Sequence, residues 1–283
     1  MLIKQVAWPP LAIWSVRSAV AALAMLAVRR VSWRDLHRVE WGAGISLALT
    51  TALFVAANKY TTAANAILIQ YSAPAWVAIL GALWLGERAS RFDWATIAVA
   101  LSGIALFFFD QLTFNHTTGN LFALTAGVTF AMHAAAVRRL AQLGRSPLRA
   151  ILLGHLIPAV VGAPFVISAV ASEPLPAQAW LILVVLGVLQ QAVPSLLYSW
   201  AIQRATALEG LLVPILEPIL SPCWVWIFLD EQPGRWALAG GSLVVGAVTL
   251  RALLGLRRDK KLAAVPGADP ATVPPADPVP GST

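Results

Sequence analysis

Residues 63–87 read AANAILIQYSAPAWVAILGALWLGE, and the segment contains no charged side chain before Glu87. A transmembrane helix needs about 20 consecutive, mostly apolar residues, and this segment supplies them. Lipid offers no hydrogen-bond partners to a backbone, so a segment that crosses it must close its own hydrogen bonds as a helix. The segment therefore predicts a membrane-spanning helix.

The same apolar character extends over the whole chain of 283 residues, of which 59% are hydrophobic and 12% charged, with a mean hydropathy of +0.75. Soluble domains carry about 25% charged residues, so a soluble enzyme, a disordered regulator and a fibrous protein are excluded. The single cysteine, Cys223, excludes a disulfide framework. We predict an all-α polytopic membrane protein with nine transmembrane helices. They cover residues 10–28, 40–57, 63–86, 92–109, 119–138, 149–171, 178–202, 207–229 and 235–256.

Basic residues are distributed unevenly over the links between these spans. Of the 20 Lys and Arg residues, 16 fall on one side of the membrane, Lys4, Lys59 and Arg235 fall on the other, and Arg17 lies within a span. Lys and Arg concentrate in cytoplasmic loops, so the pattern predicts a multi-pass protein of the cell inner membrane with a cytoplasmic C-terminus. The net charge of +7 is explained by this topology, and no nucleic-acid partner is expected.

An internal repeat relates the opening segment to a later one. Residues 57–87 align without a gap with residues 201–231, and seven of the 31 positions are identical, including Pro74 with Pro218 and Glu87 with Glu231. By the charge distribution the two segments cross the membrane in opposite directions. Inverted repeats of this kind are typical of secondary transporters, with a binding site near the midplane between the repeats.

The repeat predicts how the chain is divided. We expect a short external N-terminus at 1–9, a first repeat of four helices at 10–109 and a second repeat of five helices at 119–256. Residues 262–283 contain six prolines and predict a disordered cytoplasmic tail. Two five-helix units would give ten helices, so a leading helix is expected to be missing before Pro9.

Three short motifs occur in a recognisable order. Residues Trp8–Arg17 read WPPLAIWSVR, the opening segment contains APAW followed by LGE at its end, and residues 216–231 contain LEPI followed by LDE. In that order they resemble the second, fourth and ninth helices of EamA-type carriers of the drug/metabolite transporter superfamily. The resemblance covers residues 8–256. It implies ten helices in two inverted repeats around a central cavity, and export of small metabolites, often amino acids, or of toxic compounds.

We therefore predict a secondary active transporter that exports small organic metabolites, amino acids or related compounds, by alternating access, and we hypothesise proton antiport. No lysine follows a glycine, so the ATP-binding Walker A loop is absent, and the sequence contains neither His-Glu-x-x-His nor Gly-x-Ser-x-Gly. We expect no enzyme activity, no cofactor and no metal site. A channel and an intramembrane enzyme of unknown chemistry are the alternatives. The expected partners are a small-molecule substrate and the lipid bilayer. The sequence does not decide whether the protein forms a homodimer.

Glu217 is the main candidate for substrate binding and for proton coupling. It lies about ten residues into its span, which places it near the bilayer centre at 1.5 Å per residue. Pro214, Pro218 and Pro222 recur around it, and each proline leaves a carbonyl one turn earlier without its usual donor. A carboxylate inside a membrane is costly and usually functional. The alternative is a protonated glutamate that bonds a neighbouring helix.

Six further side chains are candidates for a substrate cavity. Gln190 and Tyr198 are eight residues apart, with Pro194 midway, which predicts one helix face. Amides and aromatic rings suit an amphipathic organic solute, although ordinary helix packing would use the same residues. The six candidates are Arg17, Gln70, Tyr71, Trp76, Gln190 and Tyr198.

Arg17 has a second interpretation, and two histidines and two glutamates are considered beside it. Arg17 could bind a substrate carboxylate through two hydrogen bonds, or tie two helices together. His133 could relay protons, and so could His155, because histidine titrates near neutral pH; hydrogen-bonded packing is the alternative for both. Glu87 and Glu231 end their spans, and for them we expect a capping or loop-bonding role.

Overall fold

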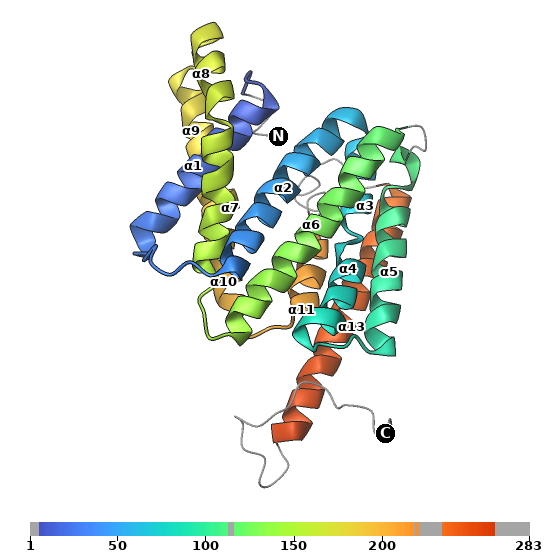
Figure 1. The fold of residues 1–283 in the computed structure, drawn as a ribbon. Coiled ribbons are helices and arrows are strands. Elements are labelled where there is room, and N and C mark those ends of the chain that lie inside the picture. The colour runs from blue at the N-terminus through green and yellow to red at the C-terminus, as the bar shows by residue number, and fades with distance from the viewer. Residues whose placement is uncertain (1–5, 113–115, 218, 221–233, 264–283) are drawn as a thin grey trace.

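The protein is described by a computed structural model that covers residues 6–112, 116–217, 219–220 and 234–263. All regular elements within these residues are helices, so the chain is an all-α polytopic membrane protein. The helices run as a bundle between two ends (Figure 1). Four loops that contain arginines lie toward the lower end of the bundle in this view, namely 29–37, 86–90, 143–147 and 202–206. We call this end of the bundle the basic end.

The element boundaries are as follows: α1 Pro10–Val28, α2 Arg38–Tyr60, α3 Ala63–Gln70, α4 Ala73–Leu80, η2 Gly81–Leu85, α5 Arg91–Phe107, η3 Phe109–Gln111, α6 Thr117–Gln142, α7 Leu148–Val161, α8 Ala163–Ser172, α9 Ala177–Val185, η4 Leu186–Ala192, α10 Val193–Ala201, α11 Ala207–Leu212, η5 Val213–Ile215 and α13 Arg235–Ala263. Elements η2 and η4 are π-helical, whereas η3 and η5 are short 3₁₀ turns.

Six continuous helices among the described residues are long and apolar enough to cross a membrane, and α7 with α8 forms a seventh candidate bent by 46°. Seven of the nine predicted spans correspond to these candidates. The predicted span at 92–109 corresponds to α5, which has 17 residues, and the span at 207–229 lies partly outside the described residues. The count of nine therefore stays a prediction.

Three helices that start at the basic end begin with a capping box. In α2 the box joins His37 and Glu40, in α5 Ser90 and Asp93, and in α11 Thr206 and Glu209. The first residue accepts a hydrogen bond from a backbone N–H, and the acid three residues later binds back to the first residue's N–H. Each box thus fixes the start of its helix. Its acidic residue also forms an ion pair with an arginine from another part of the chain.

The repeated segments begin alike. Thr62 caps α3 and Thr206 caps α11, and each side chain accepts from the N–H three residues later. The α3–α4 segment then breaks around Tyr71 and Ser72, ahead of Pro74. Since Pro74 has no N–H, the Gln70 carbonyl lacks its helical donor. Gly127 of α6 packs here, because a Cβ added to it would lie 2.9 Å from this carbonyl oxygen.

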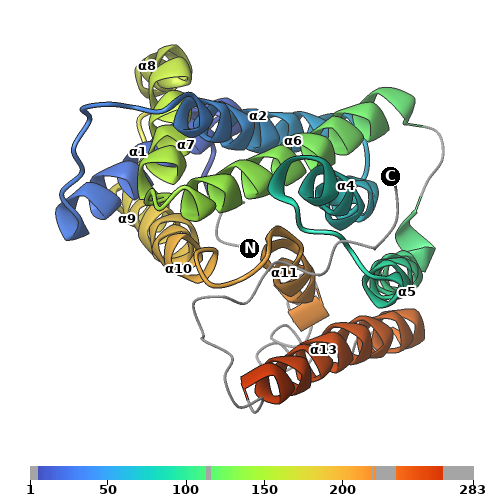
Figure 2. The same ribbon diagram turned by 60° about the horizontal axis from the view of Figure 1, so that its bottom comes forward.

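The packing brings distant parts of the chain together. Helix α2 lies along α6 and α7, α1 packs among α7, α8, α9 and η4, and α5 packs on α13 (Figures 1 and 2). Segments 10–109 and 119–256 therefore interleave across the bundle. The α5–α13 contact is close because Gly103 and Gly240 face each other, and a Cβ on Gly240 would collide with the backbone of Gly103 and Phe107.

Candidate functional site

The α11 segment presents one face to several of the predicted site residues. Gly210, Pro214 and Glu217 are spaced by four and three residues, so they lie on the same side of this segment. Gly210 packs against α10, and Pro214 binds the tyrosine that follows α3. We call Gly210, Pro214, Glu217 and the side chains that meet them the α11 site.

Tyr198 of α10 lies against the first residue of this face. A Cβ added to Gly210 would lie 3.3 Å from the Tyr198 hydroxyl and 2.8 Å from Ile202 Cδ1, so the glycine allows α11 to pack closely on this part of the chain. The hydroxyl is buried and has no hydrogen-bond partner among the described residues. The ring stacks on His133 of α6, with centroids 6.3 Å apart and planes at 25°. A buried polar atom without a partner costs about 1–3 kcal/mol, so its presence calls for an explanation.

Tyr71 meets the same face one turn further along. Its hydroxyl donates a 3.0 Å hydrogen bond to the Pro214 carbonyl. Pro218 has no N–H, so this carbonyl lacks the donor that a continuous helix would supply, and the tyrosine supplies one instead. Glu217 is exposed and lies three residues after Pro214, whose carbonyl binds Tyr71. The structure thus brings two predicted residues, Tyr71 and Glu217, into one neighbourhood.

His133 and His155 are both buried and both hydrogen-bonded. His133 Nδ1 lies 2.8 Å from the Ala43 carbonyl oxygen, and His155 Nε2 lies 2.8 Å from the Ser195 hydroxyl. A carbonyl oxygen only accepts, so Nδ1 of His133 must carry its proton. In the neutral ring Nε2 is then an acceptor. Hydrogen-bonded packing was the alternative to proton relay for both histidines, and the structure gives each of them a hydrogen-bond partner.

Arg17 and Gln190 form a separate pair on the α1 side of the bundle. Arg17 Nη2 donates to Gln190 Oε1 at 2.7 Å, while Arg17 Nε is buried without a partner among the described residues. Gln190 contacts α1, whereas Tyr198 contacts α6 and α11, although a common face was predicted. Gln190 lies within the π-helical segment η4, which interrupts the α-helical spacing on which that prediction rested.

The other predicted residues are placed as follows. Gln70 is half-buried at the end of α3, and Trp76 of α4 donates to the Ser72 hydroxyl at 3.2 Å within its own segment. Glu231 and the Pro-rich tail, apart from its first residues, lie outside the described residues.

The sequence interpretation missed three residues near the site. Ser195 holds His155, Gly210 faces Tyr198, and the side-chain oxygen of Gln191 is buried without a partner in the described part of the chain. Ser195 and Tyr198 are three residues apart within α10, a spacing that places them on one helix face and could have identified Ser195.

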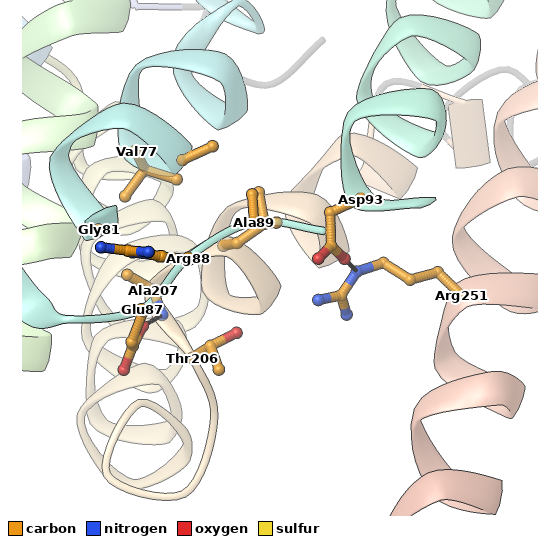
Figure 3. A pocket seen from close by; sticks show the side chains of 11 residues that line it. Val77, Gly81, Glu87, Arg88, Ala89, Asp93, Thr206, Ala207 and Arg251 are labelled. Carbon is orange, nitrogen blue, oxygen red and sulfur yellow. Dashed lines mark hydrogen bonds and ion pairs between the residues drawn. The ribbon is translucent and has the colours of Figure 1, made fainter. Parts of the chain in front are cut away.

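Ion pairs join the helices at the basic end. Glu87 accepts from Arg138 Nε at 2.6 Å and from the Ala207 N–H at 3.0 Å, so it caps the start of α11. This confirms the capping role expected for Glu87. Arg251 of α13 binds Asp93 at 2.8 Å and Glu209 at 3.1 Å. Figure 3 shows Glu87 beside Ala207, and Asp93 facing Arg251, around a small pocket between these helices.

Comparisons with known proteins give a consistent result. A profile described as the EamA-like transporter family matches residues 1–109 and 117–252. The chain is 28% identical over 272 residues to the "Probable terminal-alkyne amino-acid exporter" of Streptantibioticus cattleyicolor, covering 91% of this chain and 86% of that protein. It is 24% identical over 261 residues to "Pseudopaline exporter CntI" of Pseudomonas aeruginosa, covering 87% and 85%.

A solved crystal structure shares the fold, with a TM-score of 0.74 and 20% sequence identity, over 88% of this chain and 89% of that one. The relatives and the apolar helices agree on a multi-pass membrane protein that takes a small-molecule substrate. The chain therefore belongs to the EamA-like transporter family, and it is a membrane transporter and not an enzyme.

Proposed function

We propose that this protein exports amino acids or closely related small metabolites by alternating access, and that the substrate binds at the α11 site. The observation that carries the proposal is the Tyr198 hydroxyl, which is buried, has no partner among the described residues and lies against the face that carries Glu217. A substrate that supplied the missing hydrogen bond would remove the cost of leaving this group unpaired.

The chemistry of the site suits a zwitterion. Glu217 offers an acceptor for an ammonium group, and the hydroxyls of Tyr71 and Tyr198 offer polar contacts beside apolar rings. Two relatives carry names that refer to export, one of a terminal-alkyne amino acid and one of pseudopaline. Arg17 Nε has no partner among the described residues, so Arg17 is a second candidate, for a carboxylate, if the Gln190 contact opens.

Alternating access requires two halves that separate first at one end and then at the other. We propose that segments 10–109 and 119–256 are these halves and that they are inverted repeats. Among the described residues, four ion pairs cross between the two segments at the basic end, two through Glu40 and one each through Glu87 and Asp93. They hold that end together, which favours access to the α11 site from the other end.

The distribution of basic residues favours a cytoplasmic position for the basic end and for the C-terminus. Export then means that substrate enters at the basic end when these ion pairs open. We propose that proton antiport drives the cycle. Glu217 would take up a proton from outside, which releases substrate, and would lose it inside, which prepares the site for the next substrate. His133, whose Nε2 can accept a proton, is the second proposed proton-coupling residue.

The three tyrosines of the chain allow a matched test, because each Tyr→Phe change removes one oxygen. Tyr198→Phe should lower the rate of amino-acid counterflow in proteoliposomes by about tenfold, since one hydrogen bond to substrate is worth about 1 kcal/mol or somewhat more. Tyr60→Phe is the control, because Tyr60 lies at the far end of α2 and is 50% exposed.

Stability separates a binding role from a packing role. No described residue hydrogen-bonds the Tyr198 hydroxyl, so Tyr198→Phe should leave the midpoint of thermal unfolding equal to or higher than that of the unchanged protein. Equal counterflow rates for Tyr198→Phe, Tyr60→Phe and the unchanged protein, measured over a panel of radiolabelled amino acids, would remove the support for substrate binding at this site.

A further inference from the structure

A second cavity lies at the basic end, away from the α11 site. It is an open pocket with a volume of about 470 Å³, lined by the α1–α2 loop, the α6–α7 loop and the start of α7. Its charged side chains are four arginines and one aspartate, Asp35. The arginines are Arg30, Arg34, Arg145 and Arg149.

The walls of this cavity are held in place by two of the arginines. Arg149 Nη1 donates to the carbonyls of Ser32 and Arg34 at 3.2 and 3.0 Å, and Arg145 Nη1 donates to the carbonyl of Asp35 at 3.2 Å. Asp35 has a φ of 56°, a left-handed conformation that the aspartate side chain tolerates better than most. The loop is therefore folded around the guanidinium groups, and the cavity is a formed structure.

Glu40 pairs with two of these arginines, and both of its carboxylate oxygens are already hydrogen-bonded. Glu40 is fully buried, one oxygen binds Arg149 at 2.6 Å, and the other accepts from the His37 N–H at 2.6 Å and from Arg145 at 3.5 Å. Arg30 and Arg34 are exposed, and no ion pair involves either of them within the described residues. Four arginines against the two acids Asp35 and Glu40 leave the cavity with a net positive charge among the described residues.

The surroundings point to a lipid as the source of the matching anion. The end of α1 next to the cavity exposes apolar side chains, with Leu23 at 67% and Val28 at 66%, and Trp33 in the loop is 41% exposed. An apolar helix face below a tryptophan and several arginines is the pattern of a membrane–water interface. Basic pockets between transmembrane helices on the cytoplasmic side bind anionic lipid head groups.

We propose that this cavity binds the phosphate of an anionic phospholipid, with Arg30 and Arg34 as the contacting cations and the acyl chains along the exposed face of α1. Arg145 and Arg149 hold the walls and add positive charge. Phosphate suits this site because guanidinium groups bind it through paired hydrogen bonds. The site is separate from substrate transport, so the proposal stands independently of the function proposed above.

Native mass spectrometry of the full chain tests the proposal, with phosphatidylglycerol and phosphatidylcholine of identical acyl chains offered in equal amounts. The protein should retain phosphatidylglycerol in preference to phosphatidylcholine. The double variant Arg30→Gln/Arg34→Gln should lower this preference roughly 10- to 30-fold, since each basic residue near the surface contributes about fivefold. Neither residue takes part in an ion pair of the described structure, so the variant should fold normally.

The control is Arg88→Gln/Arg91→Gln, which removes the same charge from another exposed pair at the basic end. It should leave the preference within about twofold, because it does not touch the cavity. Equal losses in the two double variants would mean general surface attraction and would overturn the proposal. Displacement of phosphatidylglycerol by millimolar inorganic phosphate would also overturn it, because the site would then take a soluble anion.

Discussion

Glu40 shows how much depends on a single side chain in this protein. It closes the capping box of α2, and the same carboxylate neutralises two arginines from the α6–α7 region. Apolar length predicts a span that begins at residue 40, but it does not predict the capping box of His37 and Glu40. The arginine partners, 105 and 109 residues away along the chain, could not be predicted, because local spacing does not determine which helices pack together.

Removal of this charge should be costly. Glu40→Gln keeps the size of the side chain but leaves Arg149 and Arg145 without their counter-charge, and breaking a buried pair typically costs about 3–5 kcal/mol. The free energy of unfolding, measured by denaturant titration in detergent, should fall by most of that amount. Asp110→Asn is the control, since Asp110 is exposed, and it should change stability by less than about 0.5 kcal/mol. Equal stability of both variants would contradict the assignment.

The candidate site was predictable at the residue level only in part. The sequence indicated Tyr71, Tyr198 and Glu217, because polar groups inside apolar spans are conspicuous. It did not indicate that Tyr71 binds the Pro214 carbonyl or that Gly210 faces Tyr198, because both contacts depend on how α11 packs against other helices. The assignment of these residues to substrate or protons stays a prediction.

At the scale of elements, apolar length predicted where most helices lie, since each span must satisfy its own backbone in lipid. The predicted segment at 10–28 matches α1 residue for residue, and the segment at 178–202 matches α9, η4 and α10 within one residue. The π-helical segments η2 and η4 have no signature in composition. They shift the direction of side chains, and for this reason the expected common face of Gln190 and Tyr198 was not found.

Close packing of α5 on α13 leads to a prediction for these elements. Gly240→Leu should force the two helices apart, because even a Cβ there would collide with α5, and overpacking costs about 1–3 kcal/mol or more. Gly246→Leu is the matched control on the same helix, because no atom lies within 4 Å of its added Cβ. Thermal unfolding in detergent should show a lower midpoint for Gly240→Leu alone. Equal midpoints would show that the contact does not limit stability.

At the scale of the whole molecule, the loops that carry most of the basic residues lie toward one end of the bundle. The positive-inside rule therefore predicts a cytoplasmic C-terminus. A green fluorescent protein fused after Thr283 should fluoresce, whereas alkaline phosphatase at the same position should be inactive, because each reporter works on one side only. Fusions at the α5–α6 link, for example after Asn115, should show the opposite pattern. Matching signals at both sites would contradict the topology.

The central claim is that Glu217 couples substrate movement to protons at the α11 site, and the flux of Glu217→Gln tests it most directly. The variant keeps the side-chain volume and removes the charge cycle. Proteoliposomes with radiolabelled amino acids, measured with and without an imposed proton gradient, separate driven transport from exchange. The account predicts that Glu217→Gln loses gradient-driven transport while exchange without a gradient persists. Gradient-driven transport at the rate of the unchanged protein would show that Glu217 is a structural hydrogen-bonding residue and would contradict the account.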